Sequence, residues 1–582
     1  MGIIAELKRR NVLRAGVLYI GAAWALTQGL AQLFPVFGIN DWVVRWIVVA
    51  AVIGFPFWMA FAWFYEFTPS GLRRESDIDP ADSVAHATNR KFDFTIIGVL
   101  AIAVVLLLTN TLFWHKGQRL ETGSDTSAPP LSIAVLPFVN MSPDKQQDYF
   151  SDGLSEELLD QLAQVPQLRV IARTSSFSFK GKEVDIATIA KALHVANVLE
   201  GSVRKDGDTL RITAQLVRAD DSSNLWSQTY DRKLTDIFKV QDEIASQVVA
   251  ALKLKLLPAQ QPGSLQHTHN AGAYQLYLLG KQVERRDGDH PRAVRLLREA
   301  VAMDPDYANA WAELAVATDE MANNEESPLT AEQDVKAAFA AADRAIALAP
   351  NLSDGYASRG LLRYNRSWDW RGSLADFKRG HALDPGNVAL LNYYATSLFF
   401  VFNRHREAIA MSRRATVLDP LSIHAWEGLG RLLQADGQIA AADEAFRKAI
   451  DINAGATWGN YLLAYDELAA GDAKSALTHF RLIQEDPWVQ AGTAVAEYSL
   501  GHLHASQQAL DTLKSRFAAG YSFQIAAVHA WRGEKDQAFT WLDRALAQRD
   551  VGMARLRQDP TLAKLHDDPR FAELVDKMGF PK

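Results

Sequence analysis

The feature that most constrains the fold is a spaced series of prolines in the C-terminal half of the chain. Successive steps between them are 45, 35, 35 and 67 residues, for the pairs Asp304-Pro305, Ala349-Pro350, Asp384-Pro385, Asp419-Pro420 and Asp486-Pro487. The last step reads as two units with Ala454 in place of the middle proline, and the first as one unit with an insertion near Asn323–Gln333. Because proline stops a helix and a period near 34 residues is typical of stacked helical hairpins, we expect an all-helical solenoid over residues 271–582.

The clearest unit begins at Ile423 and shows which repeat this is. Its first helix has Trp426, Leu429, Gly430 and Leu433 on a W-x2-L-G-x2-Y pattern, and its second has Ala442, Phe446 and Ala449 in small, large, small order. Earlier units repeat the small residue at Ala293, Ala338 and Ala408. The segment resembles the tetratricopeptide repeat (TPR), and the final DPTLAKLHDDPRFAELVDKMGF resembles the closing segment that caps such arrays.

The TPR resemblance implies a curved groove lined by exposed positions of the first helix of each hairpin. In the two clearest units these positions are Asn392, Thr396, Phe399, His424, Glu427, Arg431 and Gln434. We expect a peptide or protein partner to contact them. The alternative is that these side chains are merely solvated.

Three charge-free apolar runs lie near the N-terminus, at residues 15–40, 47–65 and 94–114. About 20 apolar residues suffice to cross a bilayer core, so we expect spans at about 12–34, 44–66 and 93–115 in a membrane module of residues 1–116. No ionisable residue falls inside these runs, which argues against a transporter. Gly21, Ala25 and Gly29 form a ridge for a close-packed helix, either a sibling span, the favoured occupant, or a second copy of the chain.

Basic residues next to the spans predict their orientation. The N-terminal tail and the second loop carry eight of them, against three in the first loop and just after the third span. Basic loops stay in the cytoplasm. We therefore expect a bacterial inner-membrane protein with a cytoplasmic N-terminus and everything after about residue 116 in the periplasm.

A polar linker at 117–130 leads into a second region, residues 131–257, and a further linker at 258–270 precedes the repeats. Apolar patterns predict the order β-α-β-α-β-β-α at Ser132–Phe138, Gly153–Gln164, Leu168–Ala172, Asp185–His194, Asn197–Val203, Thr209–Val217 and Ile237–Leu257. This order indicates a small α/β domain in which helices pack on a mixed sheet.

The α/β region resembles the TolB N-terminal-like, or FlgO-like, domain in three ordered segments, SIAVLPFVNMSPDKQQDYFSDGLSEELLDQLAQVPQLRVIARTSSFSFKGK, NVLEGSVRKDGDTLRITAQLV and LWSQTYDRKLTDIFKVQDEIA. The resemblance implies a proteobacterial membrane protein in which this domain precedes a TPR array. Some relatives carry a winged-helix DNA-binding domain or a class III cyclase domain ahead of it. Here the residues before Leu131 are taken up by the spans and a 28-residue loop, so cyclase activity would not carry over.

The residue composition and the absence of known motifs argue against most kinds of catalytic, metal or cofactor site. The chain has no cysteine, which excludes disulfides, thiolate metal sites and cysteine nucleophiles. A net charge of −7 gives no reason to expect nucleic acid. The 14 histidines are scattered without acidic companions at ligand spacing, and no nucleotide-loop or hydrolase motif is present. We therefore expect no catalytic residue, no cofactor, no metal and no nucleic-acid partner.

Charged residues cluster in the α/β region. Asp152, Glu156 and Glu157 are expected to sit at the opening of a helix, where carboxylates favour the positive end of its dipole, rather than to catalyse a reaction. Ordinary solvated charge is the expected state of Arg169, Arg173, Lys180 and Lys182.

Three functions fit these patterns, in decreasing order. The first is a membrane-anchored TPR scaffold that binds protein partners through its extracytoplasmic domains. The second is a transmembrane signalling or regulatory protein that acts with a separate cytoplasmic partner. The third, a regulator or remnant of an adenylate cyclase system, is the weakest.

Overall fold

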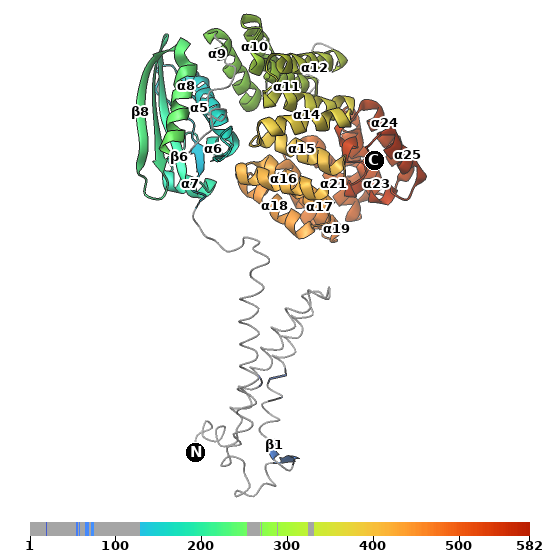
Figure 1. The fold of residues 1–582 in the computed structure, drawn as a ribbon. Coiled ribbons are helices and arrows are strands. Elements are labelled where there is room, and N and C mark those ends of the chain that lie inside the picture. The colour runs from blue at the N-terminus through green and yellow to red at the C-terminus, as the bar shows by residue number, and fades with distance from the viewer. Residues whose placement is uncertain are drawn as a thin grey trace. The chain divides into compact units, whose positions relative to one another are not determined.

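The computed structural model (Figure 1) describes residues 128–252, 268, 270–287, 289–323 and 331–581, with a few positions nearer the N-terminus. It falls into two units, Met1–Asp125 and Thr126–Lys582. In the first, β1 (Tyr65–Thr68) and β2 (Gly71–Arg74) pair as an antiparallel hairpin, and β1 overlaps the end of the predicted second span. The predicted spans otherwise lie almost wholly outside the described residues. Within the described residues, no helix is both long and apolar enough to cross a membrane.

The α/β domain contains the expected mixed sheet, in the order β5-β3-β6-β7-β8, with β4 also pairing with β6. Its strands are β3 (Ser132–Val135), β4 (Val139–Asn140), β5 (Arg169–Val170), β6 (Asn197–Asp206), β7 (Thr209–Arg218) and β8 (Asn224–Lys233). β3 runs parallel to β5 and β6, whereas β6, β7 and β8 are antiparallel neighbours. The sequence prediction missed β8 because this edge strand is mostly polar and buries only Tyr230.

Helices cover both faces of the sheet. Successive side chains of a strand point to opposite faces, and all four residues of β3 are buried, so both faces need cover. They are α5 (Asp148–Ala163), α6 (Arg173–Phe177), α7 (Ile186–Leu193) and α8 (Ile237–Ala251). Ile133 and Val135 of β3 lie in one core with α5 and α8, whereas Ala134 and Leu136 pack with α7 in another.

The repeat array consists of consecutive helical hairpins. Their helices are α9 (Ala271–Gln282), α10 (His290–Met303), α11 (Ala308–Asn323), α12 (Ala331–Leu348), α13 (Ser353–Leu362), α14 (Trp370–Leu383), α15 (Val388–Phe400), α16 (His405–Leu418), α17 (Ile423–Ala435), α18 (Ile439–Ile452), α19 (Thr457–Ala469), α20 (Ala473–Leu482), α21 (Asp486–Ser499), α22 (Leu503–Phe517), α23 (Ser522–Trp531) and α24 (Lys535–Gln548). Helices α10, α12, α14 and α16 each end two residues before a proline. The periodic prolines therefore mark the ends of second helices, as predicted. Pro487 differs, because it lies in the first turn of α21.

One hydrogen bond recurs through the array and explains its aromatic signature. In each of four units, the proline or its replacement after the second helix accepts a hydrogen bond on its backbone carbonyl. The donor is the side chain six residues later. The pairs are Trp311–Pro305, Tyr356–Pro350, Trp426–Pro420 and Asn460–Ala454, at 2.8–3.1 Å. Ala454 therefore occupies the place of a proline. Gly430 occupies the glycine position of the repeat pattern. A Cβ there would lie 2.4 Å from the Phe446 ring, so only glycine lets the two helices of the hairpin approach this closely.

The segment after α24, residues 550–581, is here called the closing segment. It contains the short helices η10 (Val551–Arg555) and η11 (Pro560–Leu565), then α25 (Pro569–Lys577). It reaches back across the array, because Arg557 donates to the carbonyls of Phe400 and Val401 at 3.0 and 2.7 Å. Trp370 of α14 donates to the carbonyl of Met578 at 3.0 Å. The closing segment was predicted to cap the array, and it also contacts α14 and α15, well before the last hairpin.

The α/β domain contacts the array at two places. Helix α5 packs against α9 so closely that a Cβ on Gly153 would lie 2.5 Å from the Leu278 side chain. At the second place, the Asp419 carboxylate accepts hydrogen bonds from the amide and hydroxyl of Ser175, at 2.9 and 2.5 Å. Both contacts fall within the single unit Thr126–Lys582.

Candidate partner-binding site

The seven predicted groove residues divide into three places. Asn392 and His424 line a cavity between the α/β domain and the array. Arg431 and Gln434 line a separate pocket among the first helices, and Thr396 lies near them, with its hydroxyl 3.4 Å from an Arg431 nitrogen. Phe399 and Glu427 line neither site. The structure therefore brings together only part of the predicted set.

The predicted exposure is wrong for Phe399, Glu427 and Gln434. Gln434 is 7% exposed, and its amide donates to the Leu462 carbonyl at 3.1 Å. Phe399 is 0% exposed and stacks on the His405 ring at 4.1 Å between centroids. Glu427 is 5% exposed, and its carboxylate accepts the Gly459 amide at 2.9 Å. Both residues face a neighbouring helix rather than solvent, because adjacent hairpins pack against more than one stripe of each first helix.

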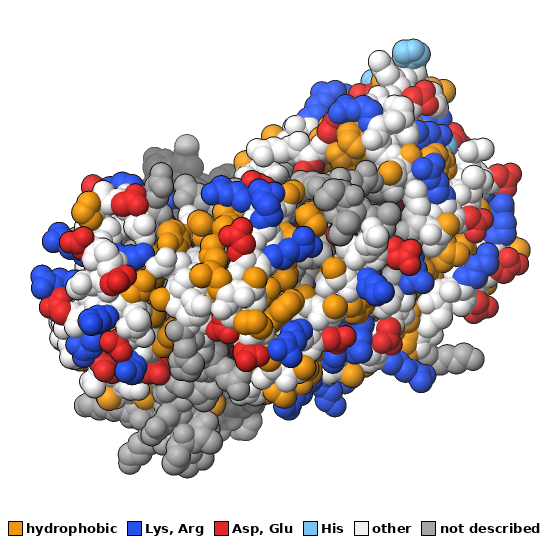
Figure 2. Space-filling model, turned by 90° about the horizontal axis from the view of Figure 1, so that it is seen from above, with side chains coloured by type: hydrophobic (Ala, Val, Ile, Leu, Met, Phe, Trp, Pro, Cys, Tyr) orange, Lys and Arg blue, Asp and Glu red, His pale blue; other side chains and the backbone are white. Residues whose placement is uncertain are grey.

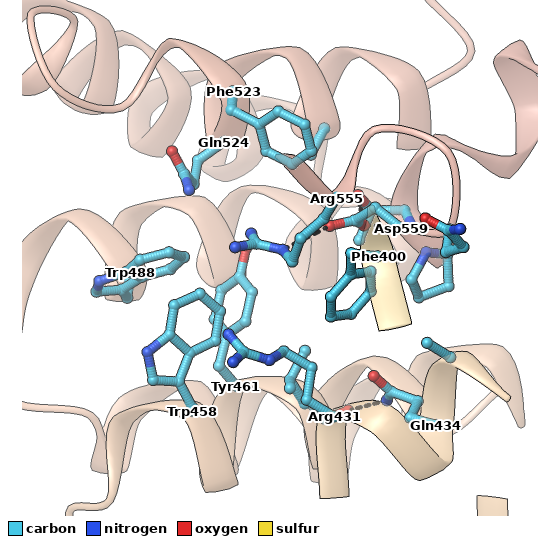
Figure 3. A pocket seen from close by; sticks show the side chains of 16 residues that line it. Phe400, Arg431, Gln434, Trp458, Tyr461, Trp488, Phe523, Gln524, Arg555 and Asp559 are labelled. Atoms are coloured by element: carbon cyan, nitrogen blue, oxygen red, sulfur yellow. Dashed lines mark hydrogen bonds and ion pairs between the residues drawn. The ribbon is translucent and has the colours of Figure 1, made fainter. Parts of the chain in front are cut away.

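The pocket around Arg431, here called the inner pocket, is shown in Figure 3. It has a volume of about 30 Å³ and is built from first helices of successive hairpins and from the closing segment. Its walls are mainly aromatic, with Trp458 and Trp488 at 4.4 Å between ring centroids and Tyr461 at 5.0 Å from Trp488. The remaining lining residues are Phe400, Arg431, Gln434, Ala435, Leu462, Phe523, Gln524, Ala527, Arg555, Gln558, Asp559, Pro560 and Thr561.

Two guanidinium groups extend into the inner pocket from opposite sides. Arg431 comes from α17 and Arg555 from the closing segment, and both lie over the Trp458 ring, at 5.7 and 5.4 Å from its centroid (Figure 3). Arg555 has an acidic neighbour, because its Nε lies 3.6 Å from the Asp559 carboxylate. Arg431 forms no ion pair with any carboxylate of the described residues, and its buried Nε has no hydrogen-bond partner among them. Burial, and after it the charge of Arg555, lowers the pKa of Arg431 to about 10.

Sequence reasoning missed most of this pocket. Trp458, Tyr461 and Trp488 lie near the starts of α19 and α21, and their clustering in successive first helices was a usable signal. Arg555 carried no such signal. Its place in the pocket depends on the closing segment folding back, which the repeat pattern does not encode.

The second cavity, here called the interdomain cavity, is larger, at about 520 Å³. Helix α5 forms one wall, and the N-terminal ends of α13, α15 and α17 form part of the other. Asp384 lies in this lining, and burial raises the pKa of its carboxyl to about 6. Asp384 accepts the Gly386 amide at 2.9 Å but forms no ion pair with a cation of the described residues.

At the edge of this cavity three cations surround one carboxylate, here called the Glu156 cluster. Glu156 accepts Arg173 and Lys281, each at 2.8 Å, and also pairs with Arg285 of the array. Although burial opposes it, the charges of Arg285, Lys281 and Arg173 hold the pKa of Glu156 well below its ordinary value. The cluster joins the α/β domain to the first hairpin.

These contacts correct two predictions. α5 begins at Asp148, so Asp152, Glu156 and Glu157 lie beyond its first turn and are buried rather than sitting at the helix opening. Arg173 and Lys180 are paired rather than freely solvated, since Lys180 lies 2.5 Å from the Asp152 carboxylate. Sequence alone did not indicate that this helix faces a second domain.

The surface is mixed in charge. Figure 2 shows basic and acidic side chains interspersed over one face of the molecule, with apolar side chains gathered between them. Across the described part of the chain, no group of three or more His, Asp or Glu residues is arranged to hold a metal ion.

Two family models match the chain. Residues 129–247 match the second domain of HilA/YgeH-like transcriptional regulators, and residues 423–455 match the tetratricopeptide repeat. The first match covers most of the α/β domain. The expected likeness of that domain to TolB N-terminal-like domains stays a prediction.

Similar proteins cover the chain in part. "Putative adenylate cyclase 3" of Rhizobium meliloti (strain 1021) is 37% identical over 217 residues, which are 35% of this chain and 36% of that protein. The chain thus spans about a third of the length of this curated relative. The solved structure of pilF from Pseudomonas aeruginosa is 16% identical, covers 36% of this chain and 93% of its own, and has a TM-score of 0.29. PilW, a widely conserved type IV pilus biogenesis factor, is 18% identical, with coverages of 37% and 98% and a TM-score of 0.30.

TM-scores this low carry no weight for function. The family match at 423–455 is independent of them, and it falls on α17 and α18, where the signature contacts of Trp426 and Gly430 are found. The chain therefore contains tetratricopeptide repeats.

Proposed function

We propose that this protein is a scaffold, held in the bacterial inner membrane by its N-terminal apolar runs, that binds a protein partner in the periplasm through the inner pocket of its repeats. TPR arrays commonly bind proteins, and the surface where successive first helices meet offers a partner several hairpins at once. The proposed role of the pocket is binding alone and involves no catalytic step.

The observation that carries this proposal is the unpaired charge of Arg431. Arg431 is partly buried and its Nε is fully buried. Even a partly buried guanidinium without a counter-ion costs free energy of folding, so a chain that keeps one has an unfavourable site unless a ligand completes it. The aromatic walls supply the apolar contact area on which interface hot spots are usually built.

Site-specific photocrosslinking in the native host tests partner binding. A photoreactive residue in place of Ala435, which lines the inner pocket, is expected to give a discrete protein adduct. The matched control is Val417, which is exposed on the second helix α16 and is expected to give none. No adduct from Ala435, or equal adducts from both positions, would contradict the proposal.

The membrane part of the proposal rests on the three apolar runs and the bias of basic residues, and it has its own test. An epitope after Lys582 is expected to be destroyed when protease is added to spheroplasts with an intact inner membrane. Survival of the epitope until the membrane is lysed would place the repeats in the cytoplasm.

A regulatory role is the second candidate. The match of residues 129–247 to a domain of transcriptional regulators favours it. In this case the protein would pass a signal to a separate cytoplasmic partner, and its deletion would change transcript levels. A transcript profile equal to that of the wild type would exclude this candidate.

A further inference from the structure

We infer that Arg431 and Arg555 together form a site for one carboxylate group of the partner, so that the closing segment supplies half of the binding site. This inference rests on the proposed function and specifies the chemistry that the partner must carry. It also gives the closing segment a role beyond capping the array.

The charge of the inner pocket is the first argument. Its lining contains two guanidinium groups and one carboxylate, Asp559, and every other lining side chain is neutral. Asp559 lies beside Arg555, which leaves Arg431 as the cation without a carboxylate partner among the described residues; its one side-chain hydrogen bond goes to the neutral Thr396 hydroxyl, at 3.4 Å. One additional negative charge would balance the pocket, and planar carboxylates match the fork of a guanidinium group.

The size of the pocket is the second argument. A volume of about 30 Å³ holds roughly two water molecules, so only the head group of a ligand can enter while the rest remains at the mouth. The aromatic rings of Trp458 and Phe523 flank the two guanidinium groups, at 5.4–5.7 Å from their centroids. These apolar walls exclude water and so strengthen a charge–charge contact made between them.

A buried amide provides the third argument. Gln524 lines the same pocket and is 6% exposed, and its side-chain oxygen has no hydrogen-bond partner among the described residues. This oxygen can accept an N–H group that enters together with the carboxylate. A C-terminal residue carries both groups next to each other, whereas an Asp or Glu side chain supplies the carboxylate alone.

Ligand-detected saturation-transfer NMR on the full chain in detergent separates these sources. The probes are N-acetylglycine, which mimics a chain terminus, N-acetylaspartate amide, which mimics an acidic side chain, and neutral N-acetylglycinamide, all at one ionic strength. We expect at least a fivefold stronger signal from the two acids than from the neutral amide. A stronger signal from N-acetylglycine identifies a C-terminal carboxylate, and a stronger signal from N-acetylaspartate amide identifies a side chain; either result supports the site.

Substitutions locate the signal. Arg431→Met and Arg555→Met are each expected to reduce the acid signals to the level of the neutral amide. Arg447→Met, which removes an exposed guanidinium on α18, is expected to leave them unchanged. Arg431→Met is the decisive variant if Arg555→Met unfolds the closing segment.

Equal signals from acids and amide, or acid signals that persist in Arg431→Met, would overturn this inference. The proposed function would survive that result as long as Ala435 still yields its adduct in cells. The proposed function fails instead if Ala435 gives no adduct in a chain that is otherwise wild type.

Discussion

At the contact between the α/β domain and the first hairpin, one buried carboxylate has three cations around it. In the inner pocket, one partly buried guanidinium has no carboxylate paired with it among the described residues. Both groups are removed from most of the solvent, so both lose hydration on folding. At Glu156 that cost is offset within the chain, whereas at Arg431 it is not.

This difference distinguishes a charge that stabilises the fold, at Glu156, from a charge that serves ligand binding, at Arg431. Removing the shared carboxylate of a buried ion cluster leaves its cations uncompensated, and therefore destabilises the fold. Removing a charge that has no counter-ion removes an unfavourable term from the free energy of folding, and otherwise affects only ligand binding. Stability measurements on the two regions should therefore move in opposite directions.

Glu156→Gln should have the largest effect. The substitution leaves Arg173, Lys281 and Arg285 without their shared carboxylate. Because Arg173 and Arg285 still reach water, we expect a loss of about 3 kcal/mol in the free energy of unfolding, near the lower end for a buried pair. Urea unfolding of the full chain measures it.

The matched control for this prediction is Asp231→Asn. It removes the pair with Arg211, at 2.7 Å, in which both side chains are more than half exposed. Stability should then stay unchanged. Equal losses from the two variants would mean that burial does not distinguish the Glu156 cluster.

Asp384→Asn should have an intermediate effect that depends on pH. Its raised pKa of about 6 means that the folded chain binds this proton more tightly than the unfolded chain, whose carboxyl titrates near 3.8. Wild-type stability therefore falls as pH rises from about 4 to 6. The variant should be more stable than the wild type by about 1–2 kcal/mol at pH 7.5 and equal to it at pH 3.5. Urea unfolding at the two pH values checks this, and a difference of the same size at both would contradict it.

Arg431→Met should have the smallest effect on stability, and of opposite sign to that of Glu156→Gln. Methionine keeps the apolar contact of the side chain and removes the unpaired charge, so we expect no loss and a gain of up to about 1 kcal/mol. Thermal and urea unfolding measure the change. A loss above about 1 kcal/mol would show that Arg431 holds the array together.

The period of the repeats was readable from sequence because its cause is local. The prolines that follow α10, α12, α14 and α16 each stop the helix before them, and Gly430 faces Phe446 within one hairpin. The mixed sheet was readable for the same reason, since the compact apolar run of β3 and the alternation along β6 and β7 need no knowledge of distant residues. The polar edge strand β8 had neither pattern and was missed.

Only part of the candidate site could be predicted from the sequence, because the rest of it comes from residues far away in the chain. Arg431 and Gln434 follow from the repeat pattern, but Arg555 reaches the same pocket only because the closing segment folds back to α14 and α15. Similarly, Glu156 gains two of its three cations, Lys281 and Arg285, from residues more than 100 positions later in the chain. Such contacts have no local signal.

The most direct test of the central claim is the yield of the Ala435 photocrosslink in cells that carry Arg431→Met. The prediction is a loss of at least tenfold in adduct, while the level and melting temperature of the protein match those of the wild type. An adduct formed at wild-type yield would contradict the claim, because the unpaired guanidinium would then play no part in holding a partner.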